Sequence, residues 1–320
     1  MPGIAPQPMN HPFQGSLVAL PTPFAGAEVD LLTLARWVQA QAAAGTDGVV
    51  ACGTTAETPT LTRSERAQVI ETVLTHAGSM TVLAGVGTNS TRTTLERALD
   101  ASGLSVDGRG VDGLLVVTPY YSRPTPAGLD LHFGAVADAV TLPIVLYNVP
   151  SRTGVDLSAE QAHALAARHT NIVAVKEATS SRDKMHALCG DPNLAVFCGE
   201  DSMAGEYMAA GAAGAIGVTG NVLPGLVSQW LAASRPDGNA QRARELAETL
   251  RPVIEVLFIE SNPGPVKAAL ALRGGASPDV RPPLGPLRAE SLEQIQRVLG
   301  EVRDECLDVD GVVGQSSATR

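Results

Sequence analysis

Two neighbouring apolar runs indicate the fold: PIVLY at Pro143–Tyr147 and IVAVK at Ile172–Lys176. Nearly every successive residue in them is apolar, whereas a strand with one face in water would alternate apolar and polar residues. Both runs are therefore predicted to be strands of a parallel sheet that is buried on both faces. Each ends in a side chain that can take part in chemistry.

Six further runs extend this pattern along the chain from Gly15 to Gly220. They are Ser16–Leu20, Gly48–Ala51, Thr81–Ala84, Gly113–Val117, Ala195–Cys198 and Ala215–Val218. The segments between the eight runs have helical length and turn residues at their borders: Leu31–Ala44, Arg63–His76, Ser90–Ala101, Ala127–Val140, Ser158–Arg168, Arg182–Leu188 and Met203–Ala210. This alternation predicts an α/β fold, a (β/α)8 TIM barrel. An open Rossmann sheet would carry a GxGxxG turn after its first strand, which GVG at Gly85–Gly87 does not provide.

The strand signal ends after Gly220, and helical segments follow at Pro224–Ala233, Ala240–Ile259, Pro265–Leu272 and Ala289–Arg303. No long linker rich in Ser, Pro and Gly separates them from the barrel. We therefore expect an N-terminal extension at 1–14, the barrel at 15–235, a C-terminal helical appendage of the same unit at 236–305 and a flexible tail at 306–320.

Composition narrows the classes of function. The chain has 23 Lys and Arg against 33 Asp and Glu, a net charge of −10, and no stretch gathers basic residues, so nucleic acid is not an expected partner. No apolar run is long enough to span a membrane, and the first fourteen residues resemble no secretory signal. The four cysteines lie far apart, which favours neither disulfides nor a metal site. A cytoplasmic protein is the expectation.

Reactive groups of a (β/α)8 barrel lie at the carboxyl ends of its strands. Lys176 ends one strand, and an apolar setting disfavours the charged form of an amine. A neutral lysine can attack a carbonyl and form an imine, as a Schiff-base aldolase requires. The alternative is a structural lysine whose stem packs while its head reaches water or pairs with Glu177.

Tyr147 ends the neighbouring strand, close enough to exchange protons with Lys176, although a strand tyrosine can equally be a packing residue. Arg152, in the following loop, can bind a carboxylate through two parallel hydrogen bonds or can be an ordinary surface arginine. The hydroxyl-rich turn Gly53–Thr58 can hold a small anion, or can be an ordinary loop. Three of the four tyrosines, Tyr120, Tyr121 and Tyr147, fall at strand ends.

Together these motifs resemble the dihydrodipicolinate synthase family of pyruvate-dependent class I aldolases. The resemblance extends from about residue 15 to about residue 299. It is carried by GTTAE at Gly53–Glu57, TPYY at Thr118–Tyr121, YNVPSRTG at Tyr147–Gly154, VKEA at Val175–Ala178 and ESNPGPVK at Glu260–Lys267.

The resemblance implies a set of roles. Lys176 would form the imine with pyruvate, and Tyr147 would shuttle protons. Thr55 would link Tyr147 to Tyr121, which a neighbouring subunit would supply within a homotetramer built as a dimer of dimers. Thr54 and Thr55 would hold the carboxylate of pyruvate, and Arg152 that of aspartate semialdehyde. Backbone positions near the imine are matched by Gly199 and Ile216.

The resemblance further implies condensation of the two substrates in the diaminopimelate route to lysine, without a metal or organic cofactor. Two alternatives remain: a related aldolase or dehydratase acting on a keto-deoxy sugar acid, and a non-catalytic homologue that binds a small acid. In family members inhibited by lysine, a glutamate and a histidine occupy the positions of Thr93 and Arg63, so weak feedback inhibition is expected here. Ala56 replaces a family glycine, and residues 104–110 form an apparent insertion, expected on the face away from the mouth.

Overall fold

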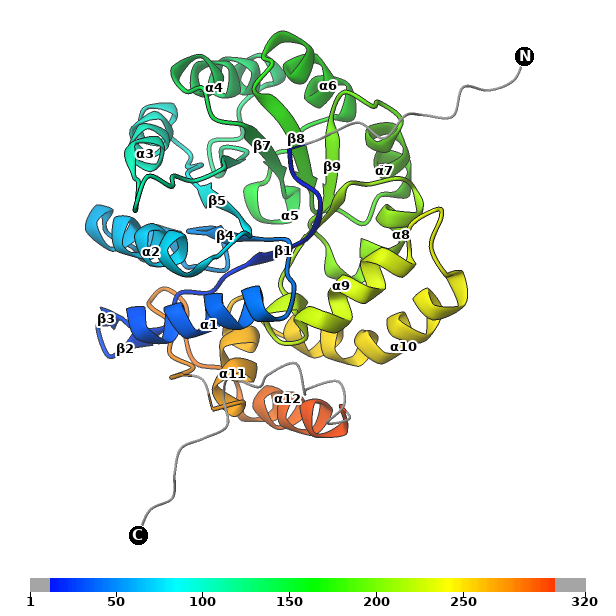
Figure 1. Ribbon diagram of the computed structural model, residues 1–320. Coiled ribbons are helices and arrows are strands. Elements are labelled where there is room, and N and C mark those ends of the chain that lie inside the picture. The colour runs from blue at the N-terminus through cyan, green and yellow to red at the C-terminus, as the bar shows by residue number, and fades with distance from the viewer. Residues whose placement is uncertain (1–11, 275, 303–320) are drawn as a thin grey trace.

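The chain folds as a closed barrel of eight parallel strands surrounded by helices, in a computed structural model that describes residues 12–302 except 275 (Figure 1). The barrel order is β1-β10-β9-β8-β7-β6-β5-β4, with β4 paired to β1. Its strands are β1 (Gly15–Ala19), β4 (Gly48–Ala51), β5 (Thr81–Gly85), β6 (Gly113–Val117), β7 (Ile144–Asn148), β8 (Ile172–Glu177), β9 (Ala195–Cys198) and β10 (Gly214–Gly217). All eight predicted strands are confirmed, to within one residue at each end.

The outer helices follow the strands in sequence. They are α1 (Leu31–Ala43), α2 (Arg63–His76), α3 (Thr91–Gly103), α4 (Pro126–Ala139), α6 (Ala159–Arg168), α7 (Arg182–Cys189), α8 (Ala204–Ala209) and α9 (Pro224–Ala233). Three further helices follow α9 in the described part of the chain: α10 (Ala240–Leu257), α11 (Gly264–Leu272) and α12 (Ala289–Glu301). These three pack against one another and α10 packs on α9, as the predicted appendage requires.

Side-chain caps fix where most of these helices begin. The oxygen of the residue before each helix accepts a hydrogen bond from a backbone N–H in the first turn, which satisfies a donor that the helix itself leaves unpaired. The capping residues are Asp30 (α1), Thr62 (α2), Ser90 (α3), Thr125 (α4), Ser158 (α6), Ser181 (α7) and Asn239 (α10). At α2 the cap is reciprocal, because Glu65 accepts from the backbone N–H of Thr62.

The core has two parts. Inside the barrel, side chains of alternate strand residues form one cluster that includes Leu17, Leu83, Phe197 and Ile216. Between the strands and the helices lies a larger cluster that continues beneath α10 and α11. Strands enclosed on both faces in this way carry continuous apolar runs, which is why the sequence pattern identified them.

The structure adds short elements that the pattern did not predict, among them the 3-10 helices Thr58–Thr60, Asp201–Met203 and Thr219–Asn221. A hairpin of β2 (Phe24–Ala25) and β3 (Glu28–Val29) follows β1, and a short helix, α5 (Pro150–Thr153), follows β7. The insertion at 104–110 lies at the amino ends of the strands, because Arg109 donates to the carbonyls of Gly78 and Met80 just before β5. The predicted tail at 306–320 lies outside the described residues, as does nearly all of the predicted extension at 1–14.

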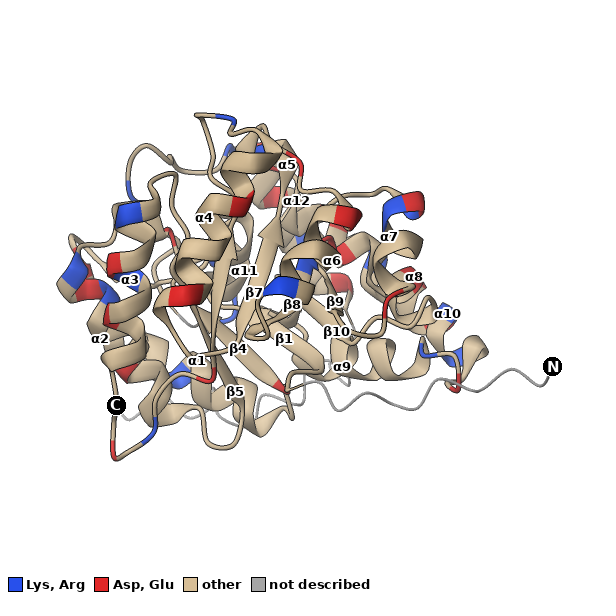
Figure 2. Ribbon diagram, turned by 90° about the horizontal axis from the view of Figure 1, so that it is seen from above, with Lys and Arg blue, Asp and Glu red and all other residues tan. Residues whose placement is uncertain are grey.

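Charged residues of both signs are interspersed over the outer helices (Figure 2). Within the described part of the chain, no helix is long and apolar enough to cross a membrane. The same residues contain no cluster of three or more His, Cys, Asp or Glu placed to hold a metal ion.

Candidate active site

Lys176 and Tyr147 are direct neighbours across the pairing of β7 and β8. Both side chains are buried, and the Lys176 amine lies over the Tyr147 ring, with Nζ 4.4 Å from the ring centroid. Among the residues that the structure describes, Lys176 Nζ has no hydrogen bond or ion pair. The other two lysines of the chain are both paired: Lys184 with Glu177 and Asp156, and Lys267 with Glu57. Lys176 is thus the lysine whose amine is available for chemistry.

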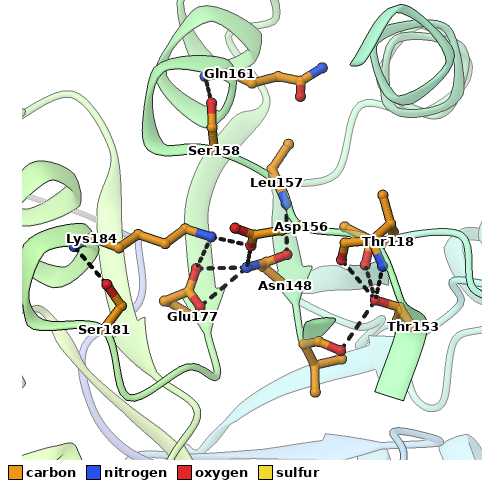
Figure 3. A network of polar contacts seen from close by, with 12 residues as sticks. Thr118, Asn148, Thr153, Asp156, Leu157, Ser158, Gln161, Glu177, Ser181 and Lys184 are labelled. Atoms are coloured by element: carbon orange, nitrogen blue, oxygen red, sulfur yellow. Dashed lines mark hydrogen bonds and ion pairs between the residues drawn. The ribbon is translucent and has the colours of Figure 1, made fainter. Parts of the chain in front are cut away.

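Glu177 does not pair with Lys176, because adjacent strand residues point to opposite faces of the sheet. The Glu177 side chain lies on the face of β8 opposite to Lys176. There it accepts a hydrogen bond from Asn148 (2.9 Å) and forms an ion pair with Lys184 (3.2 Å), as Figure 3 shows. Asn148 also donates to Asp156 and accepts from the backbone N–H of Leu157. Burial raises the pKa of Glu177, an effect that the nearby Lys184 charge opposes. The network fastens together the strand ends that carry Tyr147 and Lys176.

Thr54 and Thr55 lie in a tight turn after β4. Backbone hydrogen bonds join Ala56 to Gly53 and Glu57 to Thr54, and the Thr55 side chain is 2% exposed. The left-handed residues of this segment are Cys52 (φ 54°) and Glu57 (φ 55°), one at each end of the turn. Ala56 avoids positive φ, so it fits where the family has glycine.

A buried ion pair with Lys267 of α11 holds Glu57 in place. Lys267 Nζ lies 2.7 Å from one carboxylate oxygen of Glu57, and the backbone N–H of Arg281 donates to the other at 2.7 Å. Neither side chain of the ion pair is exposed, and burial lowers the pKa of Lys267 while Glu57 opposes that shift. Removing one member would leave a buried charge alone, at a cost of about 3–5 kcal/mol. The C-terminal segment therefore supports the hydroxyl-bearing turn.

A cavity of about 170 Å³ opens at the carboxyl end of the barrel and brings the predicted residues together. Six of the eight residues predicted for the site line it: Thr54, Thr55, Tyr147, Arg152, Lys176 and Gly199. Arg152 is exposed at the rim on α5, whose position is fixed by a hydrogen bond from Thr118 to Thr153 (Figure 3).

Gly199 leaves room for the Lys176 side chain. A Cβ at this position would lie 2.7 Å from Lys176 Cε and 3.0 Å from Lys176 Cγ, closer than carbon atoms normally approach. The absence of a side chain at Gly199 therefore sets where the Lys176 amine can lie.

The other two predicted residues lie outside this cavity. Ile216 packs in the inner core of the barrel, and Val218, two residues further along the chain, contributes to the cavity wall instead. Tyr121 is 89% exposed and has positive φ (71°), with its backbone N–H bonded to the carbonyl of Thr153.

Sequence reasoning missed Asn262 as a site residue. It precedes α11, lines the cavity, and donates from Nδ2 to Thr55 Oγ1 at 2.9 Å. Phe258, at the end of α10, also contributes to the wall. The ESNPGPVK motif contained Asn262, but only the folded chain brings it next to Thr55, 207 residues away in sequence.

The family model of the dihydrodipicolinate synthetase family matches residues 12–302 of this chain. The chain belongs to this family. A curated relative from Trichlorobacter lovleyi, named 4-hydroxy-tetrahydrodipicolinate synthase, is 44% identical over 91% of this chain and 99% of its own length.

Solved structures of the dihydrodipicolinate synthetase family agree with this assignment. The 4-hydroxy-tetrahydrodipicolinate synthase from Methylacidiphilum fumariolicum SolV is 34% identical with a TM-score of 0.88, covering 94% of this chain and 100% of that one. The dihydrodipicolinate synthase from Acinetobacter baumannii, described as chloride-inhibited and complexed with pyruvate, is 40% identical with a TM-score of 0.86, covering 90% and 98%.

Proposed function

We propose that the chain is a 4-hydroxy-tetrahydrodipicolinate synthase, a carbon–carbon lyase of the class I aldolase type that condenses pyruvate with aspartate semialdehyde on the diaminopimelate route to lysine. One observation carries the proposal: a buried lysine amine, unpaired within the described residues, lies over a tyrosine ring in a cavity lined by two threonines and an arginine. The names of the relatives support the same activity.

The reaction begins at Lys176. The unprotonated form of its amine attacks the keto carbon of pyruvate and gives a carbinolamine. A proton delivered to the hydroxyl of the carbinolamine lets water leave and forms an iminium, in which the positive nitrogen draws electrons from the neighbouring methyl group. A proton leaves that methyl, which gives an enamine. Its carbon then attacks the aldehyde of aspartate semialdehyde, whose oxygen takes up a proton.

Release of the enzyme requires the amino group of the second substrate. This amine attacks the iminium carbon, closes the ring and expels Lys176 as a free amine. Each of these steps moves a proton, and Tyr147 is the group beside Lys176 that can carry it. The iminium serves as the electron sink, so the chemistry calls for neither a metal nor an organic cofactor.

The substrate carboxylates fit two parts of the cavity. Thr54 and Thr55 form a turn that can donate hydrogen bonds to the carboxylate of pyruvate next to Lys176. Arg152, at the rim, can bind the carboxylate of aspartate semialdehyde with its planar guanidinium. With the carboxylates bound in this way, the methyl of the pyruvate imine would face the entrance through which the aldehyde arrives.

The exposed Tyr121 supports assembly with a second copy of the chain, which would cover this side chain and receive its phenol. The resemblance to the family extends this assembly to a homotetramer built as a dimer of dimers. A cytoplasmic location follows from the biosynthetic role. Sedimentation of the purified protein tests the assembly: a tetramer agrees with the proposal, and an active monomer contradicts the role of Tyr121.

An assay with both candidate substrate classes tests the function. Purified protein should consume pyruvate only when aspartate semialdehyde is present, and should leave keto-deoxy sugar acids uncleaved. Cleavage or dehydration of the sugar acid without condensation would assign the chain to the related aldolases. Binding of pyruvate without any turnover would assign it to the non-catalytic homologues.

A further inference from the structure

A second cavity, of about 590 Å³, lies between α2 and α3, which are neighbours on the outside of the barrel (Figure 1). None of the residues that line it also lines the cavity around Lys176. Its wall has an apolar part, with Leu61, Ile70 and Leu104, and a part that carries three arginines. A hollow of this size, apolar over much of its wall with a few polar groups, is typical of sites that hold a small organic molecule.

The arginines of this cavity outnumber the acidic residues that can balance them. Arg63 is neutralised by Asp100, whose carboxylate oxygens lie 2.5 and 2.7 Å from two of the Arg63 nitrogen atoms. The other two, Arg66 and Arg97, share the lining with one further acidic side chain, the exposed Glu96. The wall of the cavity therefore has an excess of positive charge.

Arg66 and Arg97 differ in how their guanidinium groups are engaged. Arg66 is buried and donates to the hydroxyl of Thr58 and to the carbonyl of Gly85 (2.9 Å), so both of its partners are neutral. Arg97 is half-buried and makes no hydrogen bond or ion pair with any residue that the structure describes. Burial lowers the pKa of Arg97, and the nearby charge of Arg66 lowers it further. Two cations thus lie close together without an anion between them, which carries an electrostatic cost.

We infer that the cavity between α2 and α3 is a binding site for an organic anion with an apolar body. A carboxylate or phosphate group next to Arg97 would accept the hydrogen bonds that its planar guanidinium can donate. The negative charge would also offset the repulsion between Arg66 and Arg97. The apolar body of the ligand would pack against Ile70 and Leu104, where it leaves water.

Calorimetric titration of the purified protein with four probes tests the chemistry of the ligand. Hexanoate and phenyl phosphate both join an anionic group to an apolar body, inorganic phosphate supplies the charge alone, and hexylammonium reverses the charge. The tighter of the first two should bind at least about tenfold more tightly than inorganic phosphate and hexylammonium, because it gains both apolar burial and charge pairing. Its affinity should fall as salt is added. The order of hexanoate and phenyl phosphate distinguishes a carboxylate ligand from a phosphate ligand.

Substitution of Arg97 locates the bound anion. Arg97→Leu removes the cation that has no partner among the described residues and keeps an apolar stem, so it should weaken binding of the preferred probe about tenfold or more. Arg92→Leu is the matched control: Arg92 is exposed on the same helix, lies outside the cavity lining, and its loss should leave the affinity unchanged. Arg152→Ala should also leave it unchanged, which excludes binding in the cavity around Lys176. Circular dichroism establishes that each variant is folded, and Arg97→Gln replaces Arg97→Leu if the latter is not.

Several outcomes would overturn the inference. Neither anion with an apolar body binds, hexylammonium binds as tightly as either of them, the substitution of Arg97 leaves the affinity unchanged, or Arg92→Leu or Arg152→Ala weakens binding as much. The titration measures binding directly and needs no turnover. The proposed function is therefore tested separately, by condensation and trapping of pyruvate, and either proposal can fail while the other stands.

Discussion

Substitution of Gly199 by alanine should inactivate the protein without unfolding it. The added Cβ would lie 2.7 Å from Lys176 Cε and 3.0 Å from both Lys176 Cγ and Ala178 Cβ, whereas carbon atoms in contact are usually about 3.5–4.0 Å apart. The contact with Ala178 needs an adjustment of only a few tenths of an ångström, and the closest contact is with the lysine. The end of a lysine side chain is flexible, so it can retreat by about 1 Å at little cost to folding. Such a displacement of a reacting group can lower the rate about a hundredfold.

The assay measures the rate of condensation, the rate of imine formation and the thermal stability of the fold. Steady-state condensation gives kcat, borohydride reduction in the presence of pyruvate gives the rate of imine formation, and thermal unfolding reports on the fold. Gly199→Ala should slow both rates about a hundredfold and leave the unfolding temperature within a few degrees of the wild-type value.

A helical glycine provides the matched control. Gly103, at the end of α3, has no atom outside its own helix within 4 Å of an added Cβ, so Gly103→Ala should leave both rates unchanged. If Gly199→Ala retains kcat within about twofold of wild type, or loses activity only in proportion to lost folded protein, the clearance at Gly199 does not position Lys176.

Three further outcomes are expected. Arg152→Ala should raise the KM for aspartate semialdehyde about tenfold or more and leave pyruvate trapping unchanged, and an unchanged KM would remove Arg152 from the site. Saturating lysine should leave kcat unchanged, because the cavity of about 590 Å³ between α2 and α3 carries Arg66 and Arg97 against the single carboxylate of Glu96, while Arg63 and Asp100 pair with each other, and the excess positive charge repels a cation; half-maximal inhibition would contradict this. Burial lowers the pKa of His132 to about 4, so as pH falls from 6.5 to 4 the unfolded chain takes up a proton that the folded chain does not. Stability should fall by about 3 kcal/mol over that interval, and His132→Gln should remove this part of the pH dependence in chemical denaturation.

Sequence patterns predicted the barrel because a strand that is buried on both faces has a continuous run of apolar residues. They also predicted that Tyr147 and Lys176 are neighbours, because the carboxyl ends of adjacent parallel strands lie at the same edge of the sheet. These predictions needed no knowledge of side-chain packing.

Other features depend on contacts between distant segments and could not be predicted from local patterns. α5 is only four residues long, too short for a helical period, so Arg152 was expected in a loop. Sequence proximity suggested Lys176 as a partner of Glu177. Successive side chains of a strand point to opposite faces, however, and Glu177 pairs with Lys184 instead. Asn262 lies in the region that the sequence suggested was an appendage, and only the folded chain shows that this region forms part of the cavity wall.

Reductive trapping can identify the lysine that forms the imine, because the chain contains only three lysines. Lys184 and Lys267 are held in ion pairs, and Lys176 alone has an amine in the cavity. Borohydride treatment with pyruvate, followed by mass spectrometry of the digested protein, should give one adduct, on the peptide that carries Lys176, and none in Lys176→Ala. An unmodified protein, or an adduct on Lys184 or Lys267, would contradict the account.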